Sequence, residues 1–259
     1  MDWAKNIFVR NAALYEQVLE GMWPRGEEDA IAIAAYLKEN GLDKCKILDI
    51  PSGIGRIGIP LARLGFEVCG VDISTHLLRT AGAKARKFNV QNRISFVKAD
   101  MHNIESKFAP ASFDAAINVF TSIGYGSEAD DLVFFHEVHG IIKKGGFLLI
   151  SGLRNRDYIL RNPSQNIYEE NDQLLVLNTY RFDTEKSREE GSWKFYKRMG
   201  NTLRFAGEFP ISVRVYSPHE LVSRLAATGW EVVDTYESFV NRGPFRPDSP
   251  VYAVAAQAV

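Results

Sequence analysis

The sequence predicts an α/β fold: a mostly parallel β-sheet with helices on both faces, plus an inserted antiparallel β-sheet. Between residues 46 and 151, short apolar strands alternate with helices, which is the order typical of a parallel sheet. After Arg161 the helical spacing disappears, and residues 165–215 read as three or four strands joined by turns. A length of 259 residues fits one large domain, or one domain that carries an insertion.

The first two helices are expected at 6–20 and 27–39, with Trp23-Pro24-Arg25-Gly26 breaking between them. Ser74 is a favourable N-cap for the helix that follows Asp72. The α/β part is expected to contain strand 46–50, helix 56–64, strand 67–72, helix 75–88, strands 94–99 and 113–120, helix 128–142 and strand 146–151.

The insertion is expected to be antiparallel, because Asp183–Glu190 and Gly200-Asn201 have turn chemistry. Its predicted strands are 172–182, 192–199 and 202–215. Ser217-Pro218-His219-Glu220 then supplies an N-cap, a first-turn proline and a capping-box glutamate. A helix to about Thr228 and strands 230–239 and 251–257 complete the chain. The predicted main domain therefore comprises residues 1–163 and 217–259, and the predicted insertion comprises residues 164–216.

Composition and charge narrow the possible partners. A net charge of −1 gives no global signal for nucleic acid. The longest nearly unbroken apolar run, Ala30–Leu37, is far shorter than the ~20 residues that a membrane span needs. Met1–Arg10 shows no signal-peptide pattern. We expect a cytoplasmic protein with a small-molecule substrate and no nucleic-acid or membrane partner, and the oligomeric state stays open.

Polar residues follow the predicted carboxyl ends of four strands, where open α/β sheets bind nucleotides. They are Asp49 with the turn Gly53-Ile54-Gly55, then Asp72, then Asp100-Met101, and finally Asn118 ahead of Thr121–Tyr125. Read literally, Gly53-x-Gly55-x-x-Gly58 also matches a dinucleotide fingerprint. Asp49 argues against that ligand, because a carboxylate beside the turn repels a pyrophosphate but attracts the ammonium of an amino-acid tail.

Taken together, these motifs resemble the class I S-adenosylmethionine-dependent methyltransferases over about residues 28–259. The resemblance implies a Rossmann-like fold and S-adenosyl-L-methionine as cofactor. The residues that it assigns to the cofactor are Asp49, Gly53 and Gly55 for the methionine moiety, Asp72 for the ribose, Ile73, Asp100 and Met101 for the adenine, and Asn118 beside the sulfonium. Pro51 stands where the family usually has its first glycine, so we expect altered local contacts there.

A narrower resemblance points to small-molecule methyltransferases, including those that N-methylate amino sugars. It depends on Leu14-Tyr15, on Val119–Tyr125 and on the antiparallel insertion, which we expect to cover the substrate cleft. Tyr15 and Tyr125 are the candidates for orienting the nucleophile or hydrogen-bonding its proton. Trp23 and Arg25 are expected in a loop that closes over the cofactor, with Arg25 pairing with its carboxylate.

The expected reaction is in-line methyl transfer to a nitrogen or oxygen of a small molecule. The alternatives are a methyltransferase for a macromolecule, a nicotinamide-dependent oxidoreductase and a non-catalytic cofactor-binding protein. No metal site is expected: His136 and His139 are three residues apart but have no third ligand, which is typical of a solvated helix face. His102 follows the adenine-binding strand and could reach the cleft, but it is expected at the surface.

Overall fold

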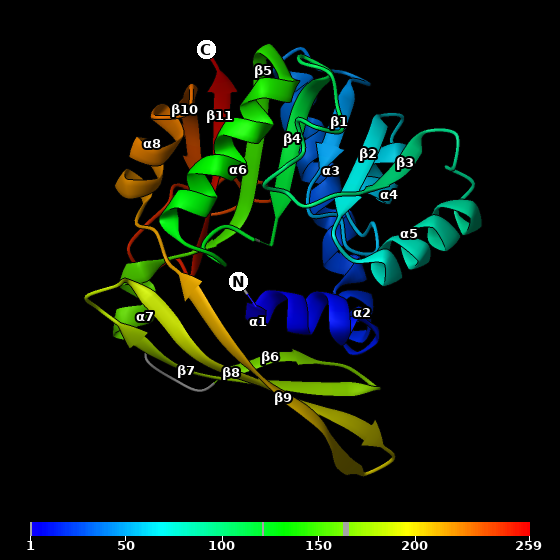
Figure 1. Ribbon diagram of the computed structural model, residues 1–259, viewed down its shortest axis with the longest axis vertical. Coiled ribbons are helices and arrows are strands. Elements are labelled where there is room, and N and C mark those ends of the chain that lie inside the picture. Colours follow the sequence, from blue (N-terminus) through cyan, green and yellow to red (C-terminus); the bar gives the residue numbers. More distant parts are fainter. Residues whose placement is uncertain (1, 121, 163–165) are drawn as a thin grey trace.

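The computed structural model describes residues 2–120, 122–162 and 166–259. It contains two sheets, called sheet A and sheet B here (Figure 1). Sheet A has the strand order β10-β11-β5-β4-β1-β2-β3. Neighbours from β5 to β3 pair in parallel, whereas β11 and β10 are antiparallel to their neighbours. The predicted fold class is therefore confirmed.

The α/β elements follow the predicted order. Their bounds are β1 Lys46–Asp49, α4 Gly58–Arg63, β2 Glu67–Asp72, α5 Thr75–Lys87, β3 Ile94–Lys98, β4 Phe113–Val119, α6 Glu128–Ile141, β5 Ile142–Arg154, α8 Pro218–Ala226, β10 Trp230–Tyr236 and β11 Val251–Ala258. The predicted helix starts are also present. The Ser74 side chain accepts a hydrogen bond from the Leu77 N–H, and Ser217 forms a capping box with Glu220.

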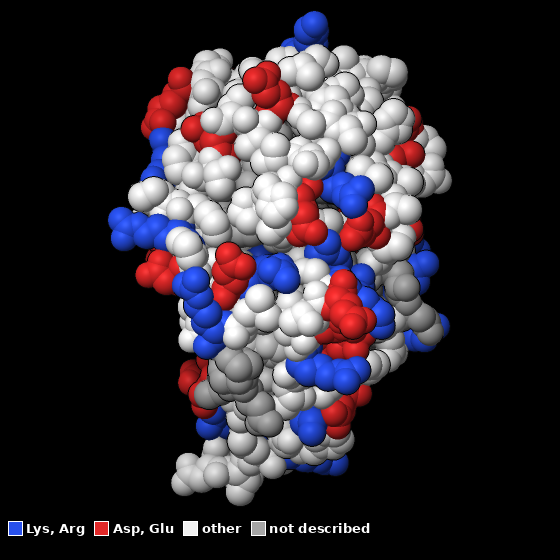
Figure 2. Space-filling view, turned by 90° about the vertical axis from the view of Figure 1, so that its left-hand side faces the viewer, with Lys and Arg blue, Asp and Glu red and all other residues white. Residues whose placement is uncertain are grey.

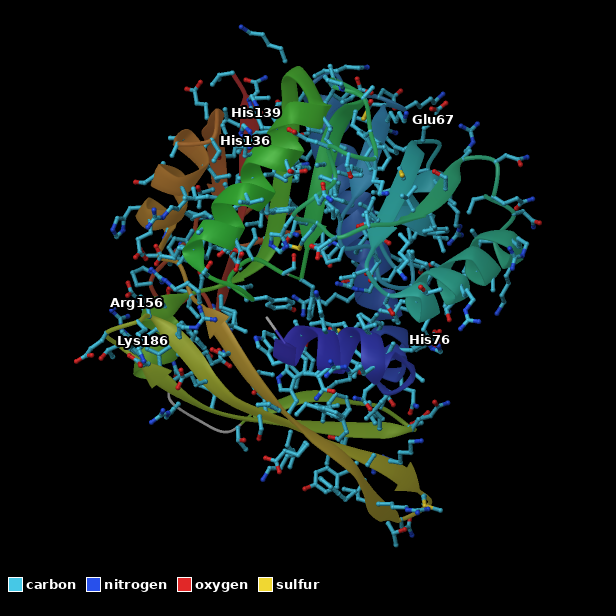
Figure 3. All side chains as sticks on the ribbon, viewed as in Figure 1. Glu67, His76, His136, His139, Arg156 and Lys186 are labelled. Atoms are coloured by element: carbon cyan, nitrogen blue, oxygen red, sulfur yellow. The ribbon has the colours of Figure 1, made fainter. Side chains whose placement is uncertain are left out.

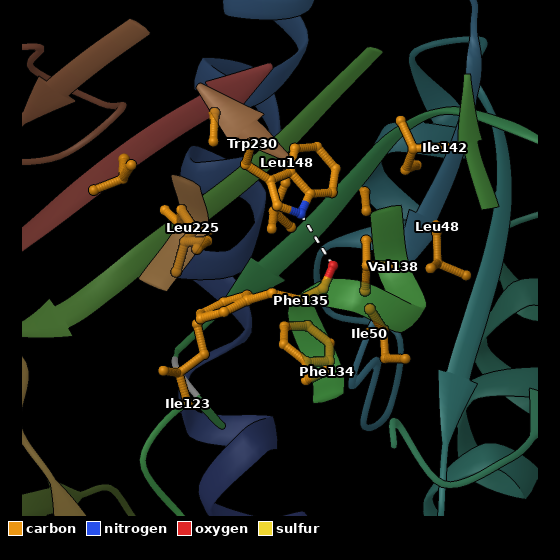
Figure 4. Packing of buried hydrophobic residues seen from close by; sticks show 14 of the residues in the cluster. Leu48, Ile50, Ile123, Phe134, Phe135, Val138, Ile142, Leu148, Leu225 and Trp230 are labelled. Atoms are coloured by element: carbon orange, nitrogen blue, oxygen red, sulfur yellow. Dashed lines mark hydrogen bonds between the residues drawn. The ribbon is translucent and has the colours of Figure 1, made fainter. Parts of the chain in front are cut away.

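Successive residues of the central strands point to opposite faces of sheet A, and each face is buried. Leu48 packs into a cluster with α6 and α8, and its neighbour Ile47 packs into a second cluster with α3 and α4. Figure 4 shows the first cluster, in which Trp230 Nε1 donates a hydrogen bond to the Phe135 carbonyl at 3.0 Å. Helices on both faces leave the carboxyl edge of sheet A as the place where loops meet.

Sheet B is antiparallel, with the order β6-β7-β8-β9. Its strands are β6 Asn166–Glu170, β7 Leu174–Asp183, β8 Arg188–Met199 and β9 Thr202–Arg214, and the short helix α7 Arg156–Arg161 precedes them. The predicted strands missed β6 and began β8 at residue 192. The polar residues 188–191 look like a turn, but they pair with both β7 and β9. The Arg188 guanidinium also donates to the Gly126 carbonyl at 3.0 Å, a contact distant in sequence.

The N-terminal elements are α1 Asp2–Lys5, the π-helix η1 Asn6–Arg10, α2 Ala12–Gly21 and α3 Trp23–Glu39. The prediction of a loop at residues 23–26 was wrong, because these residues form the first turn of α3, where proline is tolerated. Helices α1 and α2 lie between the carboxyl edge of sheet A and sheet B (Figure 1). No helix in the described ranges has the length and apolarity that crossing a membrane requires.

Candidate active site

A cavity lies between the carboxyl edge of sheet A and the helices α1 and α2. Predicted site residues that line it are Tyr15, Pro51, Gly53, Asp72, Ile73, Asp100, Met101 and Tyr125. Other lining residues include Lys5, Phe8, Leu19, Arg56, His102, Phe120 and Ser122. The structure thus brings most of the predicted residues into one place, which we call the main cavity.

Asp72 is held in place by the backbone around it. Its Oδ2 accepts a hydrogen bond from the Gly53 N–H at 2.9 Å, and its Oδ1 accepts one from the Ser74 N–H at 2.8 Å. Gly53 has φ +54°, a conformation that glycine adopts without strain. Burial raises the pKa of Asp72, although these N–H groups oppose the rise. Each carboxylate oxygen has a further lone pair for a ligand hydroxyl.

Asp100 lies at the end of β3 beside His102. Its Oδ1 accepts hydrogen bonds from the His102 N–H at 3.1 Å and from His102 Nδ1 at 2.9 Å. Burial raises the pKa of Asp100, but the contacts with His102 outweigh burial and hold that pKa below its usual value. Asp100 is therefore an ionised acceptor. Of the two positions considered for His102, the structure shows the one in the cleft, because this residue lines the main cavity.

Asp49 lies behind the cavity wall and does not line the main cavity. Its side chain is 2% exposed, and its Oδ2 accepts a hydrogen bond from the Gly58 N–H at 3.1 Å. A Cβ on Gly58 would come within 2.8 Å of that oxygen, so only glycine allows this approach. Burial raises the pKa of Asp49 to about 7, against the opposing effects of Arg56 and the Gly58 N–H.

Arg56 is a lining residue that the sequence interpretation missed. Its side chain is 4% exposed, and its guanidinium lies over the Phe120 ring, 4.6 Å from the centroid. Its Nη1 has no hydrogen-bond partner among the described residues. Burial lowers its pKa, and nearby Tyr15 and Asp29 oppose that effect. In the sequence, the only sign of this role is that a cationic residue directly follows the turn Gly53-Ile54-Gly55 and precedes the apolar Ile57.

Asn118 and Gly55 also fall outside the lining of the main cavity. Asn118 is buried, and its Nδ2 donates to the Ile50 carbonyl at 2.8 Å and to Ser122 Oγ at 2.9 Å. It therefore ties the end of β4 to β1 and positions Ser122, which does line the cavity. Gly55 has φ +78° and shapes the turn through its backbone.

Tyr15 and Tyr125 meet on either side of Phe8 in the wall formed by the N-terminal helices. The ring centroids lie 4.7 Å apart for Phe8 and Tyr15, and 5.5 Å apart for Phe8 and Tyr125. Burial raises the pKa of both tyrosines. Their hydroxyls therefore stay neutral near pH 7, so they can donate or accept a hydrogen bond without acting as phenolate bases.

Trp23 and Arg25 do not close over the main cavity. Trp23 stacks on Phe88 with ring centroids 5.6 Å apart, and its Nε1 donates to Glu27 at 3.3 Å. The Arg25 guanidinium lies over the Phe120 ring, 5.1 Å from the centroid. It lines a second cavity, bounded by Gly21, Met22, Arg25, Phe120, Arg154, Tyr168, Glu169 and Asn178. Phe120 borders both cavities.

The remaining histidines give no metal centre. His136 and His139 lie on α6, away from sheet B (Figure 3). His136 is exposed, whereas His139 packs edge-on against Trp230 with ring centroids 5.2 Å apart. Within the described part of the chain, no three His, Cys, Asp or Glu side chains are placed to hold a metal ion.

Comparison with known proteins identifies relatives over most of the chain. A family model described as a methyltransferase domain matches residues 47–146. A putative methyltransferase of Geobacillus sp. (strain WCH70) is 31% identical over 226 residues, which are 85% of this chain and 87% of that protein. A 2-phytyl-1,4-naphthoquinone methyltransferase of Nostoc punctiforme is 32% identical over 186 residues, covering 68% of this chain and 72% of the relative. A putative methyltransferase of Bacillus subtilis is 35% identical over 118 residues, 45% of this chain, and the match spans only 44% of that relative's length.

Solved structures share the fold at lower sequence identity. The CcbJ methyltransferase from Streptomyces caelestis superposes with a TM-score of 0.75 at 21% identity, covering 91% of this chain and 90% of that one. The sugar N-methyltransferase KedS8 from Streptoalloteichus sp. superposes with a TM-score of 0.68 at 15% identity, covering 93% and 91%. Both structures therefore share the overall fold of this chain.

Proposed function

Because the chain belongs to the family of S-adenosylmethionine-dependent methyltransferases, we propose that it methylates a nitrogen or oxygen atom of a small molecule. The observation that carries this proposal is the main cavity at the carboxyl edge of sheet A. Acidic groups line one part of it, and the buried guanidinium of Arg56, whose Nη1 has no hydrogen-bond partner among the described residues, lines another.

The residues of the main cavity fit this cofactor. Asp72 would bind the ribose hydroxyls with its remaining lone pairs, and ionised Asp100 would accept from the adenine amine beside Met101. The unpartnered Nη1 of Arg56 fits the methionine carboxylate, and Asp49 behind it fits the charge of the ammonium. In this assignment Arg56 takes the role that the sequence suggests for Arg25.

Bound S-adenosylmethionine supplies a methyl group on a positively charged sulfur. The acceptor's lone pair would form the new bond to that methyl group, the electrons of the broken C–S bond would stay on sulfur, and the acceptor's proton would leave to water. The protein therefore mainly positions the acceptor and excludes competing water. Tyr15 and Tyr125, neutral and buried beside the cavity, would orient the nucleophile by hydrogen bonds.

The cover over the site supports a small acceptor. Helices α1 and α2 and sheet B lie across the carboxyl edge of sheet A (Figure 1). On the face in Figure 2, basic and acidic side chains are intermixed and no continuous basic surface appears. A nucleic-acid substrate would favour a basic stripe. Family membership argues against the nicotinamide-dependent oxidoreductase.

Calorimetry with S-adenosylhomocysteine and with NAD tests the cofactor, and transfer of labelled methyl from S-adenosylmethionine to a panel of small amines, alcohols and acids tests the reaction. We expect binding of S-adenosylhomocysteine only and label in at least one small acceptor. Binding of NAD alone, or label only in protein or RNA, would contradict the proposal.

Tyr125→Phe and Tyr15→Phe test the role of the two hydroxyls. We expect each variant to slow transfer about 3- to 10-fold, the size of one neutral hydrogen bond, with unchanged affinity for S-adenosylhomocysteine. Tyr196→Phe on sheet B, which lines neither cavity, is the matched control. Rates equal to wild type in both variants would remove these tyrosines from the mechanism.

A further inference from the structure

The second cavity adjoins the main cavity but is built from different elements. Arg25 comes from the first turn of α3, Arg154 from the end of β5, and Tyr168 and Asn178 from sheet B. Phe120 is the lining residue that the two cavities share. A molecule in the second cavity would therefore lie beside a cofactor in the main cavity, with Phe120 at the border.

The two arginines in this cavity differ in how their charge is compensated. Arg154 Nη1 lies 2.9 Å from Oε2 of Glu189, a buried carboxylate that does not line the cavity. Arg25 is exposed and contacts the Phe120 ring, and its interaction with an acidic group is a coulombic one with buried Asp29 on the same helix. One guanidinium is thus fixed by a buried partner, and the other remains available to an anion.

Asn178 adds an independent sign of a ligand. Its side chain is 3% exposed, and its Nδ2 donates to Glu189 Oε1 at 3.2 Å. Its Oδ1 has no hydrogen-bond partner in the described structure. A buried amide oxygen without a partner is costly, so a hydroxyl or amino hydrogen of a bound molecule would satisfy it.

Glu169 is the carboxylate on the described lining of this cavity. Its Oε1 accepts a long hydrogen bond from Asn171 Nδ2 at 3.4 Å. Burial raises the pKa of Glu169, and the Asn171 side chain opposes that rise. Arg154 is paired with Glu189, so the attraction for a negatively charged molecule comes mainly from Arg25.

We propose that the second cavity binds the methyl acceptor, and that this acceptor carries an anionic group, a carboxylate or a phosphate, together with a hydroxyl or amino group. The inference rests on the proposed function and names its substrate class. Arg25 and Arg154 bind the anion, and Asn178 accepts a hydrogen bond from the hydroxyl or amino group. Planar guanidinium groups suit both anions because they can offer two parallel N–H donors.

The test uses matched pairs of acceptors and labelled S-adenosylmethionine. The pairs are 4-aminobutyrate with 4-aminobutanamide, 3-hydroxybenzoate with 3-hydroxybenzamide, and O-phosphoethanolamine with ethanolamine. We expect the anionic member of at least one pair to be methylated about tenfold faster or more, the size of a charged hydrogen bond. The first two pairs report a carboxylate and the third reports a phosphate.

Variants then assign the effect to the cavity. Arg25→Gln and Arg154→Gln should each lower kcat/KM for the anionic acceptor about tenfold or more, with unchanged affinity for S-adenosylhomocysteine. Arg181→Gln on β7, whose side chain is 82% exposed, is the matched control and should behave like wild type. Because Arg154 also compensates buried Glu189, Arg25→Gln decides the test if Arg154→Gln does not fold.

The outcomes separate this inference from the proposed function. If the protein binds S-adenosylhomocysteine but methylates neutral members as well as anionic ones, or methylates no anionic member, the inference fails and the cofactor assignment stands. It also fails if Arg25→Gln leaves kcat/KM for the anionic acceptor unchanged. If Arg25→Gln weakens only S-adenosylhomocysteine binding, the inference fails as well, and Arg25 is then a cofactor-binding residue. Absence of S-adenosylhomocysteine binding in wild type would overturn both.

Discussion

The two walls of the main cavity are built in different ways. The wall at the carboxyl edge of sheet A consists of turns whose polar groups are held by neighbours in sequence, such as Asp72 by the Ser74 N–H and Asp100 by the His102 N–H. The opposite wall, formed by α1 and α2, is held by aromatic contacts between distant segments. Tyr15, for example, stacks on Trp193 of sheet B at 6.1 Å.

This difference indicates which contacts determine cofactor binding at one wall and acceptor binding at the other. Backbone hydrogen bonds at the ends of parallel strands depend on local turn chemistry, so they recur wherever the same strand–turn–helix order occurs. Aromatic contacts across the cover depend on the packing of sheet B against the N-terminal helices, which can change without altering the cofactor wall. We therefore expect changes in the cover to affect methyl transfer more than cofactor binding.

Trp193→Ala should have the largest effect, because it removes the ring at the centre of the cover. Trp193 is 6% exposed and stacks on Tyr168 at 4.4 Å. Truncating a buried tryptophan costs about 3–5 kcal/mol, so the free energy of unfolding in urea should fall by this amount. Methyl transfer should fall more than affinity for S-adenosylhomocysteine.

Tyr196→Ala, on the same strand but only half-buried, is the control for that variant and should lose much less stability. An equal loss of methyl transfer and of S-adenosylhomocysteine affinity in Trp193→Ala would mean that the two walls act as one unit. It would contradict the conclusion that the cover affects transfer more than cofactor binding.

Asp72→Ala should have the next largest effect, and on the opposite wall. It removes the acceptor that we propose for the ribose hydroxyls and leaves the Gly53 and Ser74 N–H groups without their partner. We expect S-adenosylhomocysteine affinity to fall about 10- to 100-fold, the size of one or two hydrogen bonds to a charged group. Calorimetry measures it, with Asp43→Ala on the surface as control. Unchanged affinity would remove Asp72 from the cofactor site.

The same contrast explains what could be predicted from the sequence. The order of the strands and helices of sheet A could be predicted because it follows from local apolar patterns and turn residues. The convergence of Gly53, Asp72 and Asp100 could be predicted because each lies at or just after the carboxyl end of a parallel strand. The Trp23–Arg25 segment was misplaced because a first-turn proline resembles a helix break when tertiary contacts are unknown. Arg56 was missed because its importance lies in burial, which only the packing of α3 and Phe120 creates.

The smallest effect concerns Asp49, which the sequence assigns to the cofactor but which lies behind the wall. In the free protein its pKa is about 7, so below that pH it is mostly protonated. If its negative charge attracts the ammonium of the cofactor, binding must expel that proton. Affinity for S-adenosylhomocysteine should then be full above pH 7 and fall by at most about tenfold per unit as the pH drops below 7.

Asp49→Asn separates this effect from any other pH-dependent change in the protein or the ligand. The amide keeps an oxygen to accept from the Gly58 N–H, so the turn should persist while the charge disappears. Calorimetry between pH 5.5 and 7.5 should give a steeper profile for wild type than for the variant. Parallel profiles would mean that Asp49 serves only to compensate the charge of buried Arg56. Cofactor binding would then depend only on the residues that line the cavity.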